Sequence, residues 1–404
     1  MTTWRRISPA GRVLLTTVLL TGLTTFMFLP LLALEFTAQG VPATQTGFLV
    51  GLLAFCGQGF SLVSGLIVDR FGTRAVLTTG FALRIGGYLL LGAGLGVGGP
   101  DGTRLVPLVA GIAAIGVGGS LLGLSVKTLL VTEDGVEPRE MLALRSTFVN
   151  IGVVAGPALG ALVYPLGFGW ILGACVLSHL LLGVRLTVRP VRRTAPGPRA
   201  PGKGAAERAA GDGWGPRQWL PLCLLGVAYW AIYSQLNVVM PITAERTTGS
   251  TVAISVVFVV NGALVVLCQY TLLRHVFRRA QARTLLLVGF LAFALAYAVF
   301  IPFTGWFSLF VFVLPVTFAE MLISPSLDEQ AVRASSPLRT GLALGTMSAL
   351  GAVGSLLGSS MGGYLLQTFG DGGDGSGIWP VLVALSLCAA LTSFLLPKAR
   401  AQHG

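Results

Sequence analysis

Long apolar stretches alternate with short polar segments along almost the whole chain. Each apolar stretch is long enough for an α-helix to cross the hydrocarbon core of a membrane, which takes about 20 residues. The pattern predicts twelve spans, at residues 13–36, 44–68, 75–98, 105–131, 141–164, 168–188, 218–242, 251–274, 284–303, 306–328, 340–367 and 377–397. A segment rich in Pro, Gly, Ala and Arg, 189–217, separates the sixth span from the seventh. Its composition favours a flexible linker.

The spans predict an all-α integral membrane protein made of two six-helix bundles, residues 1–188 and 218–404. A glycine repeat relates the two bundles, because the fifth and the eleventh span each carry a glycine at every fourth position. These glycines are Gly152, Gly156 and Gly160, and Gly354, Gly358 and Gly362. The repeat suggests pseudo-symmetric bundles related by an axis along the membrane normal. Chance remains the alternative, since the chain has 55 glycines.

Composition and charge support a membrane location. Of the 404 residues only 10% are charged, and the mean hydropathy is +0.82, whereas a soluble protein has about 25% charged residues. The net charge of +12 is spread over short segments between spans, which indicates positive-inside anchoring and argues against a nucleic-acid partner. With the N-terminus inside, the outer loops hold only Arg104 and Arg246 among the basic residues. We therefore expect both termini in the cytoplasm, and the Gly-, Ala- and Arg-rich composition suggests a bacterial cytoplasmic membrane.

The sequence offers no sign of a cofactor or a metal site. All five cysteines lie inside apolar runs without a CxxC motif, and the three histidines are scattered, so we interpret the cysteines as small buried side chains. No G-x-x-x-x-G-K-[ST] loop is present, so ATP is not the evident energy source. An integral-membrane enzyme would need a metal or nucleophile cluster, and none is visible. We do not expect catalytic residues.

The polar turn Gly65–Arg74 joins the second and third spans. Arg70 and Arg74 lie on the predicted cytoplasmic surface, where they would be able to pair with Glu133 and Asp134 at the end of the fourth span. Asp69 would be stabilised by the positive N-terminus of the eleventh span. Such contacts would latch the two halves together. The alternative is an ordinary positive-inside turn.

The same turn resembles the loop signature of the major facilitator superfamily, G-x-x-x-D-R-x-G-R-(R/K). Gly65, Asp69, Arg70 and Gly72 match, Thr73 replaces the first of the two basic positions, and Arg74 keeps the second. The resemblance implies a twelve-span transporter that works by alternating access. The second copy of the signature is expected after the eighth span. The stretch 274–279 keeps the basic character of that signature but has no acid and no turn glycine.

The fifth span resembles the G-x-x-x-G-P-x-x-G signature of the drug:proton antiporter branch of that family. Gly152, Gly156, Pro157 and Gly160 carry the match, and the resemblance implies export by antiport. Physically, the glycines permit close helix packing and Pro157 favours a kink. Packing alone is the alternative explanation.

Charged residues inside spans are the candidates for proton coupling, because each is costly in lipid. Glu320 lies well inside the tenth span and is the leading proton carrier, since a low-dielectric cavity favours the neutral acid. A structural ion pair is its alternative. Glu35, near the outer end of the first span, is either a second candidate carrier or a surface acid. Arg84, in the middle of the third span, either tunes a carboxyl or has a structural role, because this span is usually peripheral in the resembled family.

The seventh span has the most polar face. Tyr229, Tyr233 and Asn237 recur every four residues, so we expect them on one side of a helix. Asn261 in the eighth span and Asn150 in the fifth add amide groups. Aromatic rings and amides suit a cavity for amphipathic organic molecules. Interhelical hydrogen bonds are the alternative for each residue.

The sequence therefore predicts a proton-coupled secondary transporter that exports small organic compounds. Its expected partners are the small-molecule substrate, protons and the lipid bilayer, and we expect it to function as a monomer. A proton symporter or facilitator that imports a nutrient is the alternative within the same fold. An integral-membrane enzyme is the alternative from another class.

Overall fold

The computed structural model describes residues 7–96, 101–131, 138–188, 216–277, 280–335, 340–370 and 377–396. No strand occurs in these ranges. The helices of the first half are α2 (Pro9–Ala38), α3 (Ala43–Gly59), α4 (Ser61–Phe71), α5 (Thr73–Gly96), α6 (Asp101–Val131), α7 (Pro138–Val163), η1 (Tyr164–Leu166) and α8 (Phe168–Val188). Those of the second half are α10 (Pro216–Tyr233), η2 (Ser234–Asn237), α11 (Val239–Thr248), α12 (Val252–Thr271), η3 (Leu272–Val276), α13 (Ala282–Ala298), α14 (Gly305–Ala334), α15 (Thr340–Gly370), α16 (Ile378–Thr392) and η5 (Ser393–Leu395).

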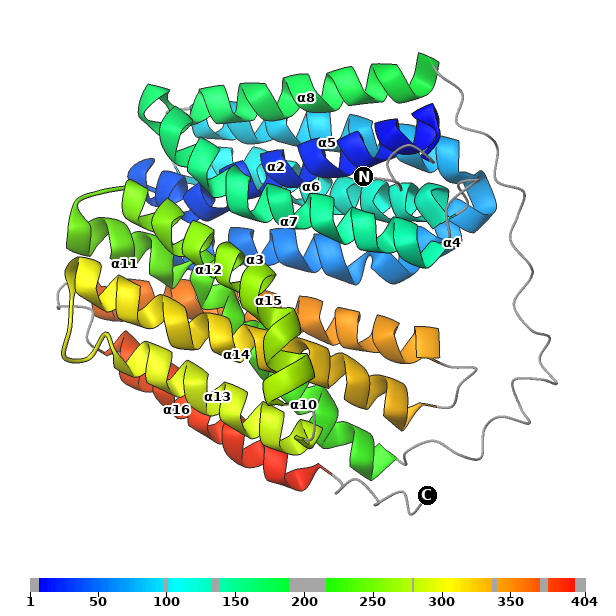
Figure 1. Cartoon of the computed structure of the whole chain (residues 1–404). Coiled ribbons are helices and arrows are strands. Elements are labelled where there is room, and N and C mark those ends of the chain that lie inside the picture. The colour runs from blue at the N-terminus through cyan, green and yellow to red at the C-terminus, as the bar shows by residue number, and fades with distance from the viewer. Residues whose placement is uncertain are drawn as a thin grey trace, which may run out of the picture.

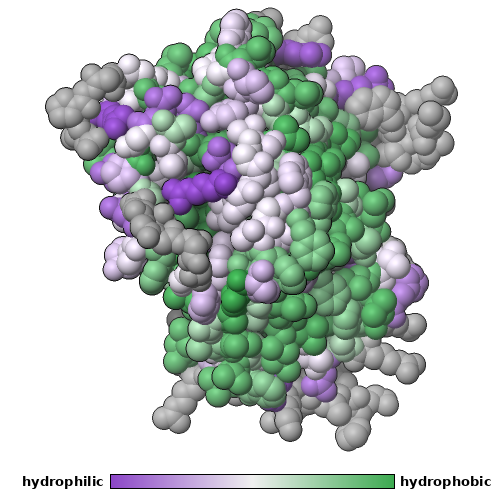
Figure 2. All heavy atoms as spheres, turned by 90° about the vertical axis from the view of Figure 1, so that its left-hand side faces the viewer, coloured by the Kyte–Doolittle hydropathy of each residue, from purple (hydrophilic) through white to green (hydrophobic). Residues whose placement is uncertain are grey.

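All twelve predicted spans appear as helices. Ten helical stretches of the described residues are long and apolar enough to cross a membrane, and Ala282–Ala298 is a shorter apolar helix. The second span is made of α3 and α4 together. Large hydrophobic side chains remain exposed on the outside of the bundle. In the end-on view of Figure 2, hydrophobic residues cover most of the lower part and hydrophilic residues gather higher up. Such an exterior is the one a lipid-facing protein needs.

Two spans are interrupted where the sequence pattern predicts continuous helices. The second breaks at Phe60, directly after the glycine that ends α3, since glycine weakens a helix. The seventh breaks at η2, because two side chains compete for one backbone carbonyl. Ser234 Oγ and Gln235 Nε2 both donate to Ala231 O, at 2.9 and 2.8 Å. Side-chain donors of this kind disturb the regular helical ladder.

The two halves form two bundles that lie side by side, with α2–α8 above and α10–α16 below in Figure 1. The glycine repeats occupy equivalent places in the two bundles. In the first half Gly156 of α7 packs on α2, where an added Cβ would lie 2.7 Å from Phe26 Cβ. In the second half Gly354 of α15 packs on α10, where an added Cβ would lie 3.0 Å from Val227 Cα. Each repeat therefore brings two helices of its own half into backbone contact.

The halves meet mainly along two pairs of helices, α3 with α15 and α7 with α12, and α2 adds smaller contacts with α11 and α12. At Gly47 the backbones of α3 and α15 are so close that an added Cβ would meet Ser359 O and would lie 2.9 Å from Gly363 Cα. Across the other pair, Ser255 Oγ donates to Pro157 O at 2.8 Å. Between the two contacts the halves enclose a cavity.

Candidate functional site: a central cavity between the halves

The central cavity has a volume of about 510 Å³ and is lined from both halves. The first half contributes residues of α2, α3, α5, α6 and α7, and the second half contributes residues of α10, η2, α12, α14 and α15. Apolar residues make up the larger part of the lining, and polar side chains from both halves lie among them. This combination is typical of a site for a small organic ligand.

Glu320 lines the cavity from the middle of α14. Tyr233 OH donates to its Oε1 at 3.1 Å, and Asn261 Nδ2 donates to its Oε2 at 3.0 Å. The Asn261 amide is itself placed by Thr317, whose Oγ1 accepts from Nδ2 at 3.0 Å. No basic side chain of the described residues forms an ion pair with Glu320. Its carboxyl group is therefore held by neutral donors from α10 and α12, and no structural ion pair accounts for it in this part of the chain.

Arg84 reaches the same cavity from α5 and is 6% exposed. Its Nη2 donates to Thr25 Oγ1 at 2.7 Å, and its guanidinium carbon lies 5.7 Å from the centroid of the Tyr88 ring. The sequence left a peripheral, structural role open for this residue. The structure instead places a cation of the first half and the carboxyl group of the second half, Glu320, in one cavity.

Most of the predicted polar residues also line the cavity. They are Tyr233, Asn237, Asn261 and Asn150. Tyr229 does not line it: the side chain is 2% exposed and stacks on Tyr233, with ring centroids 5.6 Å apart. The two rings thus share one side of α10, but Tyr233 reaches the cavity and Tyr229 does not, so the predicted place in the cavity is corrected for Tyr229.

Several lining residues were not anticipated. They are Thr25, Gln58, Trp230, Ser355 and Ser359. Ser355 and Ser359 are spaced by four on α15, directly after Gly354 and Gly358 of the glycine repeat. This spacing was a usable signal in the sequence. The glycines predict the face of α15 that packs on another helix, and the serine after each glycine lies on the adjoining face of the same helix.

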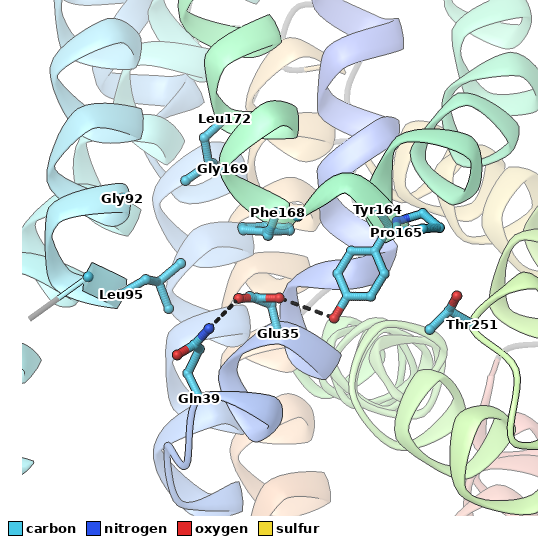
Figure 3. A pocket seen from close by; sticks show the side chains of 12 residues that line it. Glu35, Gln39, Gly92, Leu95, Tyr164, Pro165, Phe168, Gly169, Leu172 and Thr251 are labelled. Carbon is cyan, nitrogen blue, oxygen red and sulfur yellow. Dashed lines mark hydrogen bonds between the residues drawn. The ribbon is translucent and has the colours of Figure 1, made fainter. Parts of the chain in front are cut away.

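Glu35 lies in a different pocket, of about 670 Å³, near the end of α2. Tyr164 OH donates to its Oε2 at 3.1 Å, and Gln39 Nε2 donates to its Oε1 at 2.9 Å, as Figure 3 shows. The side chain is 8% exposed. Thr251 lines this pocket from the second half. The two candidate proton carriers, Glu35 and Glu320, are thus in separate sites.

The turn between the second and third spans has the backbone that its glycine predicted. Gly72 has φ +81°, a conformation that favours glycine. The Arg70 guanidinium carbon lies 5.4 Å from the centroid of the Phe71 ring. The Asp69 side chain, Glu133 and Asp134 lie outside the described residues. The latch among them therefore stays a prediction. No group of three His, Cys, Asp or Glu in the described ranges would hold a metal ion.

The glycines predicted for the fifth span have a packing role. Added Cβ atoms at Gly152 and Gly156 would lie 2.9 Å from backbone atoms of α2, and Gly160 packs on Met27. Pro157 uses its carbonyl for the contact with Ser255 of the other half. The motif thus connects α2 and α12 through α7, next to the cavity residue Asn150.

Twelve spans in two six-helix halves around a central cavity define the fold of a secondary transporter. The chain belongs to the Major Facilitator Superfamily, whose family model matches residues 14–328. It is 26% identical over 350 residues to the multidrug resistance protein MdtH of Yersinia pestis (strain Pestoides F), covering 85% of this chain and 83% of that protein. The MdtH of Yersinia pseudotuberculosis serotype O:1b (strain IP 31758) matches with the same identity and coverage.

Solved structures with the same fold include two transporters of the POT family. An auto-inhibited POT family peptide transporter matches with a TM-score of 0.78 and 13% identity, covering 98% of this chain and 99% of that one. A POT family transporter in complex with 5-aminolevulinic acid matches with a TM-score of 0.74 and 13% identity, covering 96% and 95%. At this identity the likeness concerns the fold alone. It confirms the predicted architecture of two six-helix bundles.

Proposed function

We propose that this transporter exports small amphipathic organic compounds in exchange for protons, and that Glu320 carries the proton. The position of Glu320 carries the proposal, because the carboxyl group lies in the central cavity and its donors among the described residues are neutral. A titratable group inside a membrane protein that faces a cavity is a functional candidate by default. The multidrug-resistance relatives support export as the direction.

Proton binding at Glu320 is coupled to its hydrogen bonds. A carboxylate accepts from both Tyr233 and Asn261, whereas a protonated carboxyl group has one oxygen that donates. Protonation therefore weakens or reverses one of the two hydrogen bonds, whose partners lie on α10 and α12. A cationic group of the substrate favours the charged carboxylate, so substrate and proton compete for one site. That competition is the physical basis of exchange.

Alternating access then requires the two halves to rock about the cavity. The two helix pairs that join the halves, α3 with α15 and α7 with α12, are the contacts that change. We place both termini in the cytoplasm, where the Asp69 turn acts as the latch, and we take the monomer as the working form. An importer with the same fold is the competing function, and the direction of substrate flux separates the two.

The test uses inverted membrane vesicles whose lumen has been acidified and is followed with a pH-sensitive dye. Adding members of a panel of organic cations and zwitterions should release luminal protons from vesicles with the transporter. Vesicles without it, and vesicles with Glu320→Gln, should not respond. Compound uptake that persists unchanged after an uncoupler collapses the gradient would overturn the proposal.

A further inference from the structure

The central cavity contains a buried cation that the proposed proton exchange does not use. Arg84 is the one residue of α5 that lines the cavity among the described residues. Its side chain passes α6 at a pair of glycines. An added Cβ on Gly118 would lie 2.8 Å from Arg84 Cγ, and one on Gly119 would lie 3.9 Å from Arg84 Cζ. Two glycines thus leave the space through which α5 sends a guanidinium into the cavity.

The immediate neighbours of the guanidinium are neutral. Thr25 accepts from Nη2, the Tyr88 ring lies beside the group, and Nε has no hydrogen-bond partner. Behind Tyr88 lies His179, with ring centroids 5.5 Å apart. No carboxylate of the described residues forms an ion pair with Arg84. The charge is therefore buried without a protein counter-ion in this part of the chain.

A buried guanidinium in this state is suited to bind an anion from the cavity. Removing a charge from water is costly unless a partner of opposite charge compensates it. The planar fork of arginine binds carboxylate and similar anions with two parallel hydrogen bonds. Thr25 occupies one donor, and the free Nε shows that the fork has capacity left.

The second half supplies the remaining contacts for such a ligand. Trp230 and Tyr233 offer aromatic surface in the same cavity, and Asn237 Oδ1 is a buried acceptor without a partner. Glu320 supplies the negative charge. The cavity thus has a cation in the first half and an anion in the second, with apolar and aromatic side chains in the same lining.

We propose that Arg84 determines substrate specificity by binding the anionic group of amphoteric organic substrates, whose amine is directed to Glu320. This inference rests on the proposed function in taking the central cavity as the transport site. It adds that the preferred substrates carry a carboxylate or a similar anion besides an amine and an aromatic body. A purely cationic amphiphile uses only half of the site.

A matched pair of fluorescent probes tests the proposal. Nε-dansyl-lysine carries an amine and a carboxylate, and dansylcadaverine is the same molecule without the carboxylate. Equilibrium binding of each is measured on the purified full chain in lipid nanodiscs, with no proton gradient. We expect the wild type to bind Nε-dansyl-lysine roughly tenfold or more tighter than dansylcadaverine, as expected for a charged hydrogen-bonded pair.

Three variants complete the experiment. Arg84→Gln should abolish the preference by weakening Nε-dansyl-lysine while leaving dansylcadaverine unchanged or tighter. Arg84→Lys keeps the charge but not the fork, so it should retain part of the preference. Arg145→Gln is the matched control: it removes a half-buried arginine of α7 outside the cavity lining, and both affinities should stay at the wild-type values.

Two results would overturn the assignment. One is a wild type that binds Nε-dansyl-lysine no tighter than dansylcadaverine. The other is an Arg84→Gln protein that weakens both probes equally, which is the signature of a structural role. Because binding is measured without a gradient, its outcome is independent of proton coupling. Loss of the vesicle response would contradict the proposed function and leave the binding preference intact.

Discussion

Glu35 and Glu320 have the same chemical surroundings in two different places. Each carboxyl group accepts one hydrogen bond from a tyrosine hydroxyl, at 3.1 Å in both cases, and one from a side-chain amide, at 2.9 Å for Glu35 and 3.0 Å for Glu320. Neither forms an ion pair among the described residues. By their direct contacts alone, the two acids would be assigned the same role.

The difference lies in which helices supply the donors and which cavity the acid faces. Glu35 receives its bonds from Gln39, the residue directly after the end of α2, and from Tyr164 in η1, both in the first half. Glu320 receives its bonds from α10 and α12, and it shares the central cavity with Arg84. Both acids thus receive their bonds within their own half, and what distinguishes Glu320 is that it faces the cavity lined by both halves. The comparison teaches that placement, and not local chemistry, distinguishes the proposed coupling acid, Glu320, from Glu35.

The largest expected effect comes from neutralising each acid in turn. Glu320→Gln should reduce compound-dependent proton release in acidified vesicles to the level of vesicles without the transporter, because no titratable group remains at that point of the cavity. Glu35→Gln should keep the response within roughly threefold of wild type, since its hydrogen bonds are local. The reverse order of effects would break the comparison and make Glu35 the carrier.

A smaller effect is expected from removing the tyrosine donors. Tyr233→Phe deletes a hydrogen bond to the acid in the cavity, and a bond to a charged group contributes about 1.5–3 kcal/mol. We expect the vesicle response to fall roughly tenfold. Tyr164→Phe removes the equivalent bond from Glu35 and should lower thermal stability slightly without changing the response. Equal losses of transport in both variants would contradict the distinction between the two sites.

The smallest effect on transport is expected from a change at the contact between the halves. This change acts mainly on the free energy of unfolding. Gly47→Val adds atoms where a Cβ would already lie 2.9 Å from Gly363 Cα. We expect a loss of about 1–3 kcal/mol in the free energy of unfolding, as for other overpacked sites, measured by thermal or denaturant unfolding in detergent. Gly86→Ala is the control, since nothing lies within 4 Å of the added atom. A stable Gly47→Val protein would show that the halves do not depend on this contact.

The helical architecture was predictable because lipid imposes it. A span needs about 20 apolar residues with every backbone polar group paired inside the helix, so hydropathy alone locates it. The breaks at Phe60 and at η2 were not predicted. The first follows a glycine at the end of α3, and the second arises from side-chain donors that compete for Ala231 O; neither leaves a mark on the apolar pattern. Gly72 was predictable, since a glycine between charged residues is typical of a tight turn.

The candidate site was predictable only where a residue is costly in its place. Glu320 and Arg84 stand out because a charged side chain in an apolar span is energetically costly and therefore indicates a functional site. Trp230 and Ser355 do not, because aromatic and hydroxyl side chains are ordinary in packed membrane helices. Tyr229 was expected in the cavity and is buried behind Tyr233 instead. Helical spacing gives the relative directions of side chains but does not say which neighbour each direction meets.

The sequence by itself determined the number of spans and the division into two halves. It also identified the charged residues inside spans, which are costly in lipid and therefore candidates for function. These features follow from the free energy of transfer into lipid, which each segment carries locally. Only the tertiary structure decided that Glu320 and Arg84 share one cavity and that Glu35 lies outside it. Those relations depend on contacts between residues far apart in the chain, among them the glycine contacts that set how closely α3 and α15 approach.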